Sequence, residues 1–292
     1  MDEKTDVEKM TYPMLKGESE KSAYFGYTCI GGRQEDQDCL AYINENGRQV
    51  FVVCDGMGGH AGGCVASVTA VNALTNSFRR QAEIVPTTEA IIAAVNDANT
   101  AVYNKAQDEP SLRGMGTTLT LLVIDAQAAY VTHVGDSRIY QLRKGRKIFR
   151  TFDHSMVFGQ VAKGKMTEEE ARLHPRSNVL SKALGILPDI EANVRKLSYK
   201  ANDRFILCCD GVWNTQPEPD IISMFTANPD LETTILSTRS LVEKLGKEKG
   251  GQHDNHTMIA VDMKCNSIYN KSVLRAVCHL FDKVRNHKKV HQ

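Results

Sequence analysis

Long hydrophobic runs, paired cysteine motifs and an excess of either charge are all missing from this sequence of 292 residues. Without a run of about 18 or more apolar residues, no transmembrane helix is expected. None of the eight cysteines forms a C-x-x-C pair, so neither a zinc ribbon nor a thioredoxin-like motif has support. Lysine and arginine total 36 and aspartate and glutamate total 35, and the resulting net charge of +1 gives no bulk attraction to nucleic acid.

The composition that is present is typical of a folded domain. Hydrophobic residues make up 41% of the chain and charged residues 24%, which argues against disorder and against a coiled coil. A chain of this length can bury its own core without disulfides, so we expect reduced thiols in a cytoplasmic protein. The first ten residues are polar and charged and no apolar run follows them, so no secretory signal is expected.

Short apolar runs alternate with helical patterns between about residues 24 and 264. Runs rich in apolar and β-branched residues predict strands at 50–54, 117–124, 129–134, 138–142, 205–209 and 257–262. Apolar residues at helical spacing predict two long helices, at 65–78 and 88–103. A hairpin turn predicted at 125–127, combined with paired long helices, indicates antiparallel sheets with helices packed on their outer faces.

The chain divides into three parts by composition. Residues 1–22 are polar and mixed in charge and predict a loose arm, and residues 23–264 contain no linker or repeat and predict one domain. Residues 265–292 carry a net charge of +5 and an apolar stripe, which predict a basic helix or tail. Such a helix can dock on a membrane surface or a partner, or pack on the domain with a solvated basic face, and both interpretations stay open.

Acidic residues lie where the predicted strands end. Asp55, Asp136 and Asp210 each follow a strand, and Asp254 with Asn255 precedes the last one. Strand ends on one edge of a sheet converge, so we expect these side chains to meet. Carboxylates brought together cannot all stay ionised without a shared proton or a divalent cation. Oxygen ligands favour Mg²⁺, Mn²⁺ or Ca²⁺ over zinc.

A glycine-rich turn follows the first of these carboxylates. The stretch 55–63, DGMGGHAGG, holds five glycines in nine residues and leads into the first predicted helix. Glycine beside Asp55 lets the backbone turn so that a carbonyl can also face a metal, and a helix N-terminus favours anions. One Asp-Gly pair alone is usually an ordinary turn, but several acidic strand ends together indicate a metal site.

Eight segments, in order through the chain, carry a resemblance to a known family. They are GGRQEDQD (31–38), VVCDGMGGHAGG (52–63), RGMGTTLTLLVI (113–124), THVGDSRIY (132–140), DHS (153–155), SNVLSKALG (177–185), ILCCDGVWN (206–214) and HDNHTMIAV (253–261). With them the chain resembles the metal-dependent protein Ser/Thr phosphatases of type 2C, the PPM family, in their bacterial form. The resemblance implies an α+β fold, a four-layer α-β-β-α sandwich of two antiparallel sheets flanked by helices. Residues 154–185 correspond to the family's flap, a segment beside the cleft of a kind that often contacts substrate.

The resemblance also implies a binuclear Mn²⁺ or Mg²⁺ centre in a cleft at one edge of the sheets. Asp55 would bridge both metals, and the Gly56 carbonyl would bind the second. Asp210 and Asp254 would bind the first metal. Asp38 would act on the second metal, directly or through water.

Further roles follow from the same resemblance. Asp136 would join Asp210 at a third, weaker metal, Arg33 would grip the substrate phosphate, and Asn255 would orient the loop that carries Asp254. Two metals clamp a phosphoryl group and activate water, which suits hydrolysis of phosphoserine and phosphothreonine without a nucleophilic cysteine. The expected partners are phosphorylated proteins, among them a cognate Ser/Thr kinase. We expect a monomer that neither binds nucleic acid nor spans a membrane.

Several residues depart from the family's pattern. Gln37 stands where eukaryotic members carry a metal-linked glutamate, so we expect a supporting role for it. Met57 stands where eukaryotic members carry a histidine general acid, which bacterial members also lack. Asp36, Cys64 and Asn214 differ from the usual residues as well. Because the metal aspartates are all present, we predict an active enzyme.

Two other functions stay open on the sequence. The first is a pseudophosphatase, a regulator that keeps the fold and binds phosphoproteins without turnover; Gln37 and Cys64 keep it open, and the intact aspartates argue against it. The second is a small-molecule phosphomonoesterase, which only the family resemblance separates from a protein phosphatase.

Overall fold

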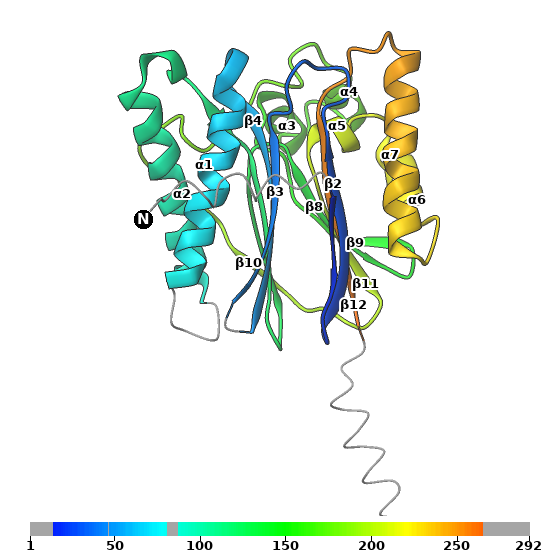
Figure 1. The fold of residues 1–292 in the computed structure, drawn as a ribbon. Coiled ribbons are helices and arrows are strands. Elements are labelled where there is room, and N and C mark those ends of the chain that lie inside the picture. Colours follow the sequence, from blue (N-terminus) through cyan, green and yellow to red (C-terminus); the bar gives the residue numbers. More distant parts are fainter. Residues whose placement is uncertain (1–13, 46, 81–86, 265–292) are drawn as a thin grey trace, which may run out of the picture.

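The structure is a computed structural model that describes residues 14–45, 47–80 and 87–264. Two antiparallel sheets lie face to face and helices cover the outer face of each, which gives the four layers seen in Figure 1. The predicted α-β-β-α sandwich is therefore confirmed. The basic tail predicted at 265–292 lies outside the described residues, as does the first half of the predicted N-terminal arm.

The first sheet joins strands from the two ends of the described chain. Its spatial order is β1 (Met14–Glu18), β2 (Ser22–Cys29), β12 (His256–Met263), β11 (Asp203–Cys208), β8 (Arg138–Arg143) and β9 (Arg146–Arg150), with every neighbouring pair antiparallel. Because β2 pairs with β12, the loop that leaves β2 and the loop that enters β12 meet at one edge of the sandwich.

The second sheet is built from the middle of the sequence. Its order is β10 (Arg195–Leu197), β7 (Ala129–Val134), β6 (Leu119–Ile124), β4 (Arg48–Met57) and β3 (Asp38–Glu45), and β5 (Gly116–Thr117) pairs with the end of β4. The predicted hairpin joins β6 to β7, and Asp125 Oδ1 accepts hydrogen bonds from the backbone of Gln127 and Ala128. The register of β3 on β4 places Asp38 opposite Asp55.

Strand β4 shows why its sequence is an unbroken apolar run. Val50, Val52 and Cys54 pack on the helical side, and Phe51 and Val53 pack on the other sheet. Successive side chains of a strand point to opposite faces, so a strand covered on both sides needs apolar residues at every position. This burial makes the end of β4 a fixed platform for Asp55.

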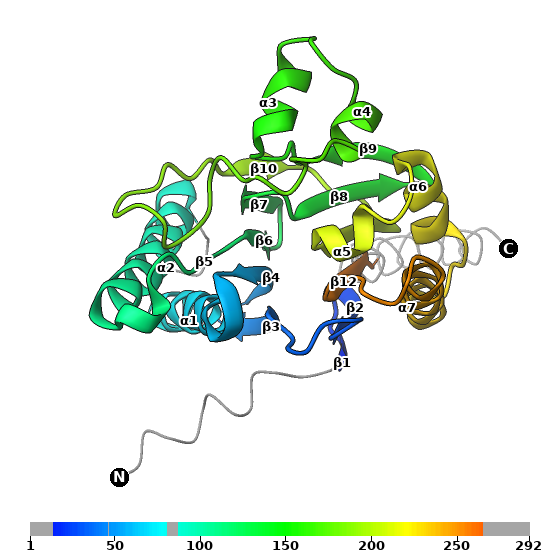
Figure 2. The same cartoon turned by 90° about the horizontal axis from the view of Figure 1, so that it is seen from above.

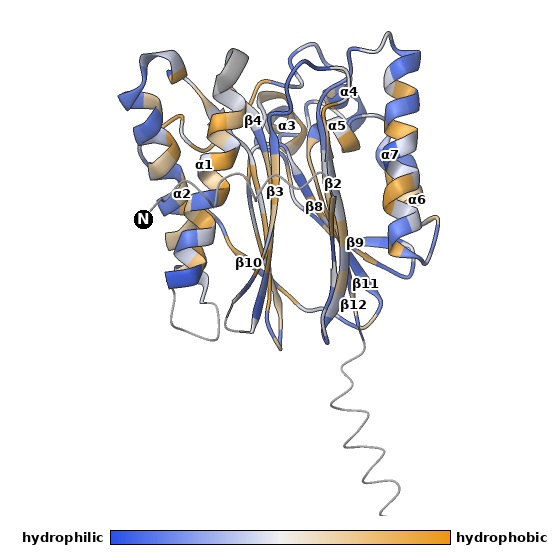
Figure 3. Cartoon of the chain, viewed as in Figure 1, coloured by the Kyte–Doolittle hydropathy of each residue, from blue (hydrophilic) through white to orange (hydrophobic). Residues whose placement is uncertain are grey.

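Two helices cover each sheet. α1 (Gly59–Arg80) and α2 (Thr88–Asp108) pack on the second sheet, and α6 (Glu218–Thr226) and α7 (Leu231–Glu248) pack on the first (Figure 2). Figure 3 shows that these helices are hydrophobic on one side and hydrophilic on the other, as helices on the surface of a core must be. Within the described part of the chain, no helix is long and apolar enough to cross a membrane.

Short helices lie near the ends of the sheets. α3 (Met156–Ala162) and α4 (Glu168–Arg172) project from one side of the sandwich (Figure 2), α5 (Asp210–Trp213) follows β11, and a 3₁₀ turn, η1, spans Pro110–Leu112. Thr167 and Glu170 form a capping box at the start of α4, in which each side chain accepts a hydrogen bond from the backbone N–H of the other.

The N-terminal arm predicted for residues 1–22 is wrong in its second half, because Met14–Glu18 forms the edge strand β1. Its residues are alternately exposed and half-buried, and Lys16, Gly17 and Glu18 interrupt any apolar run, so the strand has little sequence signal. Strands β2, β3, β9 and β10 and helices α3, α5, α6 and α7 were not predicted either.

Candidate metal centre and phosphate site

Five aspartates from separate segments approach one edge of the sandwich. Asp38 opens β3, and Asp55 lies opposite it near the end of β4. Asp136 lies between β7 and β8, Asp210 begins α5 directly after β11, and Asp254 precedes β12. Since β11 pairs with both β8 and β12, the segments that carry these last three lie side by side.

The aspartates surround a cleft of about 240 Å³. Its lining residues are Arg33, Gln37, Asp55, Gly56, Met57, Gly58, Thr118, Asp136, Asn178, Leu180, Asp210, Asp254 and Asn255. Every residue predicted for the site is in this lining except Asp38, which is buried beside Asp55. The structure therefore brings together the residues that the sequence singled out.

The electrostatics of the cleft favour the binding of cations. Burial raises the pKa of Asp38 to about 8 and that of Asp210 to about 6, and it raises the pKa of Asp55 and Asp136 well above the ordinary value. Repulsion from neighbouring aspartates adds to the effect of burial in each case. At neutral pH such a cluster retains protons unless positive charge neutralises it.

Asp38 shows which kind of cation fits. Its Oδ2 accepts a hydrogen bond from Cys209 Sγ at 3.2 Å, while its buried Oδ1 has no hydrogen-bond partner among the described residues. A buried carboxylate oxygen without a partner is costly, and a hard divalent cation would satisfy it. Burial raises the pKa of the Cys209 thiol well above its usual value, so Cys209 stays a protonated donor. The remaining candidate metal ligands are oxygen atoms, which fit Mn²⁺ or Mg²⁺.

The glycine-rich turn allows two backbone segments to touch beside Asp55. A Cβ on Gly56 would lie 2.0 Å from the carbonyl oxygen of Gly63, and a Cβ on Gly63 would lie 2.8 Å from that of Gly56. Gly59, at the start of α1, has a φ of +73°, in the left-handed region that favours glycine. Any side chain at Gly56 or Gly63 would therefore displace the Gly56 carbonyl, the group expected to face a metal.

Thr117 and Thr118 hold the backbone of Asp55 from the neighbouring strand. Thr118 Oγ1 accepts a hydrogen bond from Asp55 N at 3.0 Å, and Thr117 Oγ1 donates one to Asp55 O at 2.9 Å. Thr118 Oγ1 also lies 2.7 Å from Ser137 Oγ, next to Asp136. The strand predicted at 117–124 is interrupted at Thr118, where these contacts replace the regular ladder. The sequence assigned these threonines mainly to a strand and missed Ser137.

Arg33 and Asp254 form the mouth of the cleft. Arg33 Nη2 donates to Asp254 Oδ2 at 2.8 Å, and the two side chains are 53% and 45% exposed. An ion pair this exposed contributes little to stability, so the guanidinium can turn to another anion at small cost. Its planar fork suits the oxygens of a phosphate group.

Asn255 ties the two mouth loops together. Its Nδ2 donates to the carbonyl oxygens of Ile30 and Glu35 at 2.8 and 2.9 Å, and its Oδ1 accepts from Gln37 N at 2.9 Å. Asn255 thus fixes the loop that carries Arg33 as well as lying beside Asp254. The Gln37 side chain donates to the Gly59 carbonyl at 3.1 Å and so joins the same loop to the start of α1.

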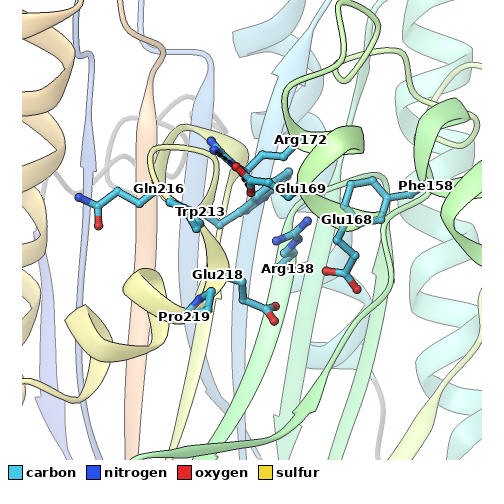
Figure 4. A pocket seen from close by; sticks show the side chains of 10 residues that line it. Arg138, Phe158, Glu168, Glu169, Arg172, Trp213, Gln216, Glu218 and Pro219 are labelled. Atoms are coloured by element: carbon cyan, nitrogen blue, oxygen red, sulfur yellow. Dashed lines mark hydrogen bonds and ion pairs between the residues drawn. The ribbon is translucent and has the colours of Figure 1, made fainter. Parts of the chain in front are cut away.

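An arginine and a tryptophan stack against each other in a separate pocket, which Figure 4 shows. Arg138 makes two hydrogen bonds to buried Asp153, at 2.8 and 2.7 Å, and its guanidinium carbon lies 3.4 Å from the centre of the Trp213 ring. Trp213 Nε1 donates to the backbone oxygen of Asp136 at 2.9 Å. Because Trp213 ends the helix that Asp210 begins, it couples the positions of the two aspartates. Trp213 therefore both packs in the core and holds the backbone of Asp136.

A family model described as "Protein phosphatase 2C" matches residues 25–248. The chain belongs to this family. Among curated relatives, the Serine/threonine phosphatase stp of Listeria monocytogenes is 31% identical over 230 residues, covering 76% of this chain and 87% of that protein. Protein phosphatase PhpP of Streptococcus pneumoniae is 34% identical over 235 residues, covering 79% and 93%. The family predicted from the eight segments is therefore confirmed.

Solved structures of the phosphatase 2C family agree with the fold. Serine/threonine phosphatase Stp1 of Staphylococcus aureus superimposes with a TM-score of 0.76 at 27% identity, covering 82% of this chain and 94% of that one. The catalytic domain of the serine threonine protein phosphatase PstP, crystallised with two manganese ions, gives a TM-score of 0.72 at 28% identity, covering 84% and 99%.

The residues that depart from the phosphatase 2C pattern differ in their position relative to the cleft. Met57 lines the cleft. Asp36 turns toward its own loop, where it accepts hydrogen bonds from Thr28 Oγ1 at 2.7 Å and from the backbone of Asp38 at 3.1 Å. Asn214 caps the end of α5 through its backbone. Asn178 and Leu180 of the flap and Cys209 were missed as site residues because they are uncharged, although they lie in two of the eight segments.

Proposed function

We propose that this chain hydrolyses phosphoserine and phosphothreonine in proteins at a centre of two Mn²⁺ or Mg²⁺ ions. The observation that carries the proposal is that three aspartates with raised pKa values, Asp55, Asp136 and Asp210, line one cleft, with a fourth, Asp38, buried beside Asp55. Membership of the phosphatase 2C family and the manganese-bound PstP neighbour support the same chemistry.

Different carboxylates are assigned to different ions. Asp55 would bridge the two ions, Asp210 and Asp254 would hold the first, and the Gly56 carbonyl and Asp38 would hold the second. Asp136 would share a third, weaker ion with Asp210. When bound, such ions neutralise phosphoryl oxygens and lower the pKa of water.

The groups at the mouth position the substrate. Arg33 leaves Asp254 and directs its two terminal nitrogens at the phosphate, which orients the phosphorus for in-line attack. Asn255 keeps the Arg33 loop and the Asp254 loop at a fixed separation through its three hydrogen bonds. Met57 cannot donate a proton, so the chain offers no general acid at that position.

The substrates are phosphorylated proteins, among them a cognate Ser/Thr kinase, and the enzyme acts as a monomer in the cytoplasm. The names of the bacterial relatives support the substrate class. Sedimentation of the purified full chain at micromolar concentration tests the monomer, for which we expect a single species near 32 kDa.

The decisive experiment compares two substrates and two metal conditions. We expect hydrolysis of a phosphothreonine peptide and of a chromogenic aryl phosphate with Mn²⁺ or Mg²⁺, and loss of both activities with EDTA. Asp97→Ala, an exposed aspartate on α2, is the matched control and keeps full activity. Retention of phosphopeptide binding without turnover would instead identify a phosphoprotein-binding regulator, and hydrolysis of the aryl phosphate alone a small-molecule phosphatase.

A further inference from the structure

A second cavity, of about 270 Å³, adjoins the catalytic cleft. Its apolar lining consists of Met57, Leu180, Ala183, Ile186, Leu187 and Ile190, and we call it the apolar groove. Met57 and Leu180 line both the groove and the cleft. A substrate that places its phosphate beside Asp55 therefore has this surface next to it.

The groove exposes large apolar side chains to water. Ile186 is 43% exposed and Leu187 is 65% exposed, whereas most leucines and isoleucines of the strands are buried. Such exposure next to a binding cleft is typical of a surface that buries a partner's apolar group.

The backbone behind these side chains is held in place. Leu184 exchanges two backbone hydrogen bonds with Thr117, at 2.9 and 3.1 Å. The buried side chain of Asn99 donates to the carbonyl oxygens of Leu187 and Pro188, both at 3.0 Å, and accepts from Gly185 N at 2.9 Å. The segment is therefore preorganised, and binding there requires little ordering of the protein.

Met57 and Ile186 meet at the junction of groove and cleft. A Cβ on Gly116 would lie 2.9 Å from Ile186 Cδ1 and 3.0 Å from Met57 Cε, so both side chains reach the same glycine. They form a continuous apolar path from the residue after Gly56 to Leu187. Methionine at position 57, where eukaryotic members of the family carry a histidine, therefore has a structural consequence: a polar residue there would interrupt this apolar path.

We propose that the apolar groove binds a bulky apolar side chain of the phosphoprotein, close to the phosphorylated residue, and so selects substrates. The inference rests on the proposed phosphatase function. The charges at the rim agree with an apolar rather than an acidic partner. Lys182 donates to the Glu191 carbonyl at 3.2 Å and lies 3.6 Å from its carboxylate, while Asp189 is exposed.

The test uses phosphothreonine peptides that differ at one position at a time, with leucine or serine on either side of the phosphothreonine, and an aryl phosphate as a substrate too small to reach the groove. For the wild-type full chain we expect about tenfold higher kcat/KM for the leucine peptide at one or more positions, since burying a leucine side chain accounts for a difference of this size. Leu187→Ser should abolish most of that preference and leave aryl phosphate hydrolysis unchanged. Leu187→Met should keep the preference.

The matched control is Leu173→Ser, which removes an equally exposed leucine at the end of α4. It should retain the leucine preference, and unfolding temperatures should show that all variants are folded. Equal kcat/KM for leucine and serine peptides at every position, or a preference that survives Leu187→Ser, would overturn the proposal while aryl phosphate turnover still upholds the phosphatase function. A dimer in sedimentation that Leu187→Ser dissociates would also overturn it, because the groove would then be covered by a second copy.

Discussion

The floor and the mouth of the cleft are built differently. The floor consists of Asp38, Asp55, Asp136 and Asp210, whose segments are packed between sheets and helices and whose pKa values are raised by burial. The mouth consists of Arg33 and Asp254, about half exposed, on loops between strands. The aspartates of the floor, which repel one another, are held by packed segments, whereas Arg33 and Asp254, which can exchange partners, lie on loops.

The supports of the two regions differ in the same way. Thr117, Thr118 and Trp213 fix the backbone of the floor from neighbouring elements of the sandwich. The two mouth loops are joined chiefly through Asn255. We therefore expect changes in the floor to affect metal binding and turnover together, and changes at Arg33 in the mouth to affect substrate binding.

The largest effect is expected in the floor. Asp55→Ala and Asp210→Ala each remove a carboxylate from the metal cluster, so we expect a loss of turnover of about 10³-fold or more, because metal ions contribute several kcal/mol to such reactions. Isothermal titration should show weakened Mn²⁺ binding in both variants. Turnover close to that of the Asp97→Ala control would refute the binuclear assignment.

The pH dependence of the metal-free protein tests the floor without catalysis. Asp38 has a pKa of about 8 when folded and about 4 when unfolded, so its protonated form stabilises the fold below about pH 4, and this contribution is lost as the pH rises toward 8. We expect the free energy of unfolding in EDTA to fall by up to several kcal/mol between about pH 5 and 8. Saturating Mn²⁺ should remove most of this decline.

Asp38→Asn provides the comparison, because asparagine keeps the shape and does not titrate. In EDTA its unfolding free energy should depend less on pH than that of the wild type over the same range. An exposed control, Asp97→Asn, should behave like the wild type. If Asp38→Asn and the wild type decline in parallel, Asp38 is not the group responsible.

The mouth is tested by Arg33→Ala, for which we expect a higher KM and nearly unchanged Mn²⁺ affinity. Losing a charge-assisted contact to phosphate costs about 2–3 kcal/mol, or roughly 30- to 150-fold in KM. The KM of Arg33→Lys should lie between those of the wild type and Arg33→Ala, since lysine keeps the positive charge and lacks the planar fork of the guanidinium. Arg80→Ala, another exposed arginine paired with an aspartate, is the control. An unchanged KM for a phosphopeptide would remove Arg33 from the phosphate site.

The smallest effect is expected for Asp136→Ala, at the edge of the floor. Its side chain is expected at the third ion only, so activity should change by less than about tenfold. A crystal of the variant grown with Mn²⁺ should keep two ions and lose one. Loss of all ions would instead place Asp136 among the ligands of the central pair of ions.

Much of the site could be predicted from the sequence, because its acidic residues follow apolar strands. Asp55 and Asp210 each end such a run and stand next to glycine, a local signal that needs no knowledge of the partner strand. The glycine-rich turn and the order of the eight segments gave the family and the fold class. The edge strand β1 was missed because its polar residues leave no apolar run, whereas α6 and α7 each carry an apolar face that the sequence could have indicated.

Other features were decided only in three dimensions. The pairing of β2 with β12 brings Asn255 to the loop of Arg33, more than 200 residues away in the chain. The contacts of Thr118 with Asp55, of Trp213 with Asp136 and of Cys209 with Asp38 depend on which strands are neighbours. The apolar groove arises where Met57 meets the segment at 180–190. Local sequence determines which residues can end a strand or bind a metal, whereas packing between distant segments determines which of them meet and how deeply they are buried.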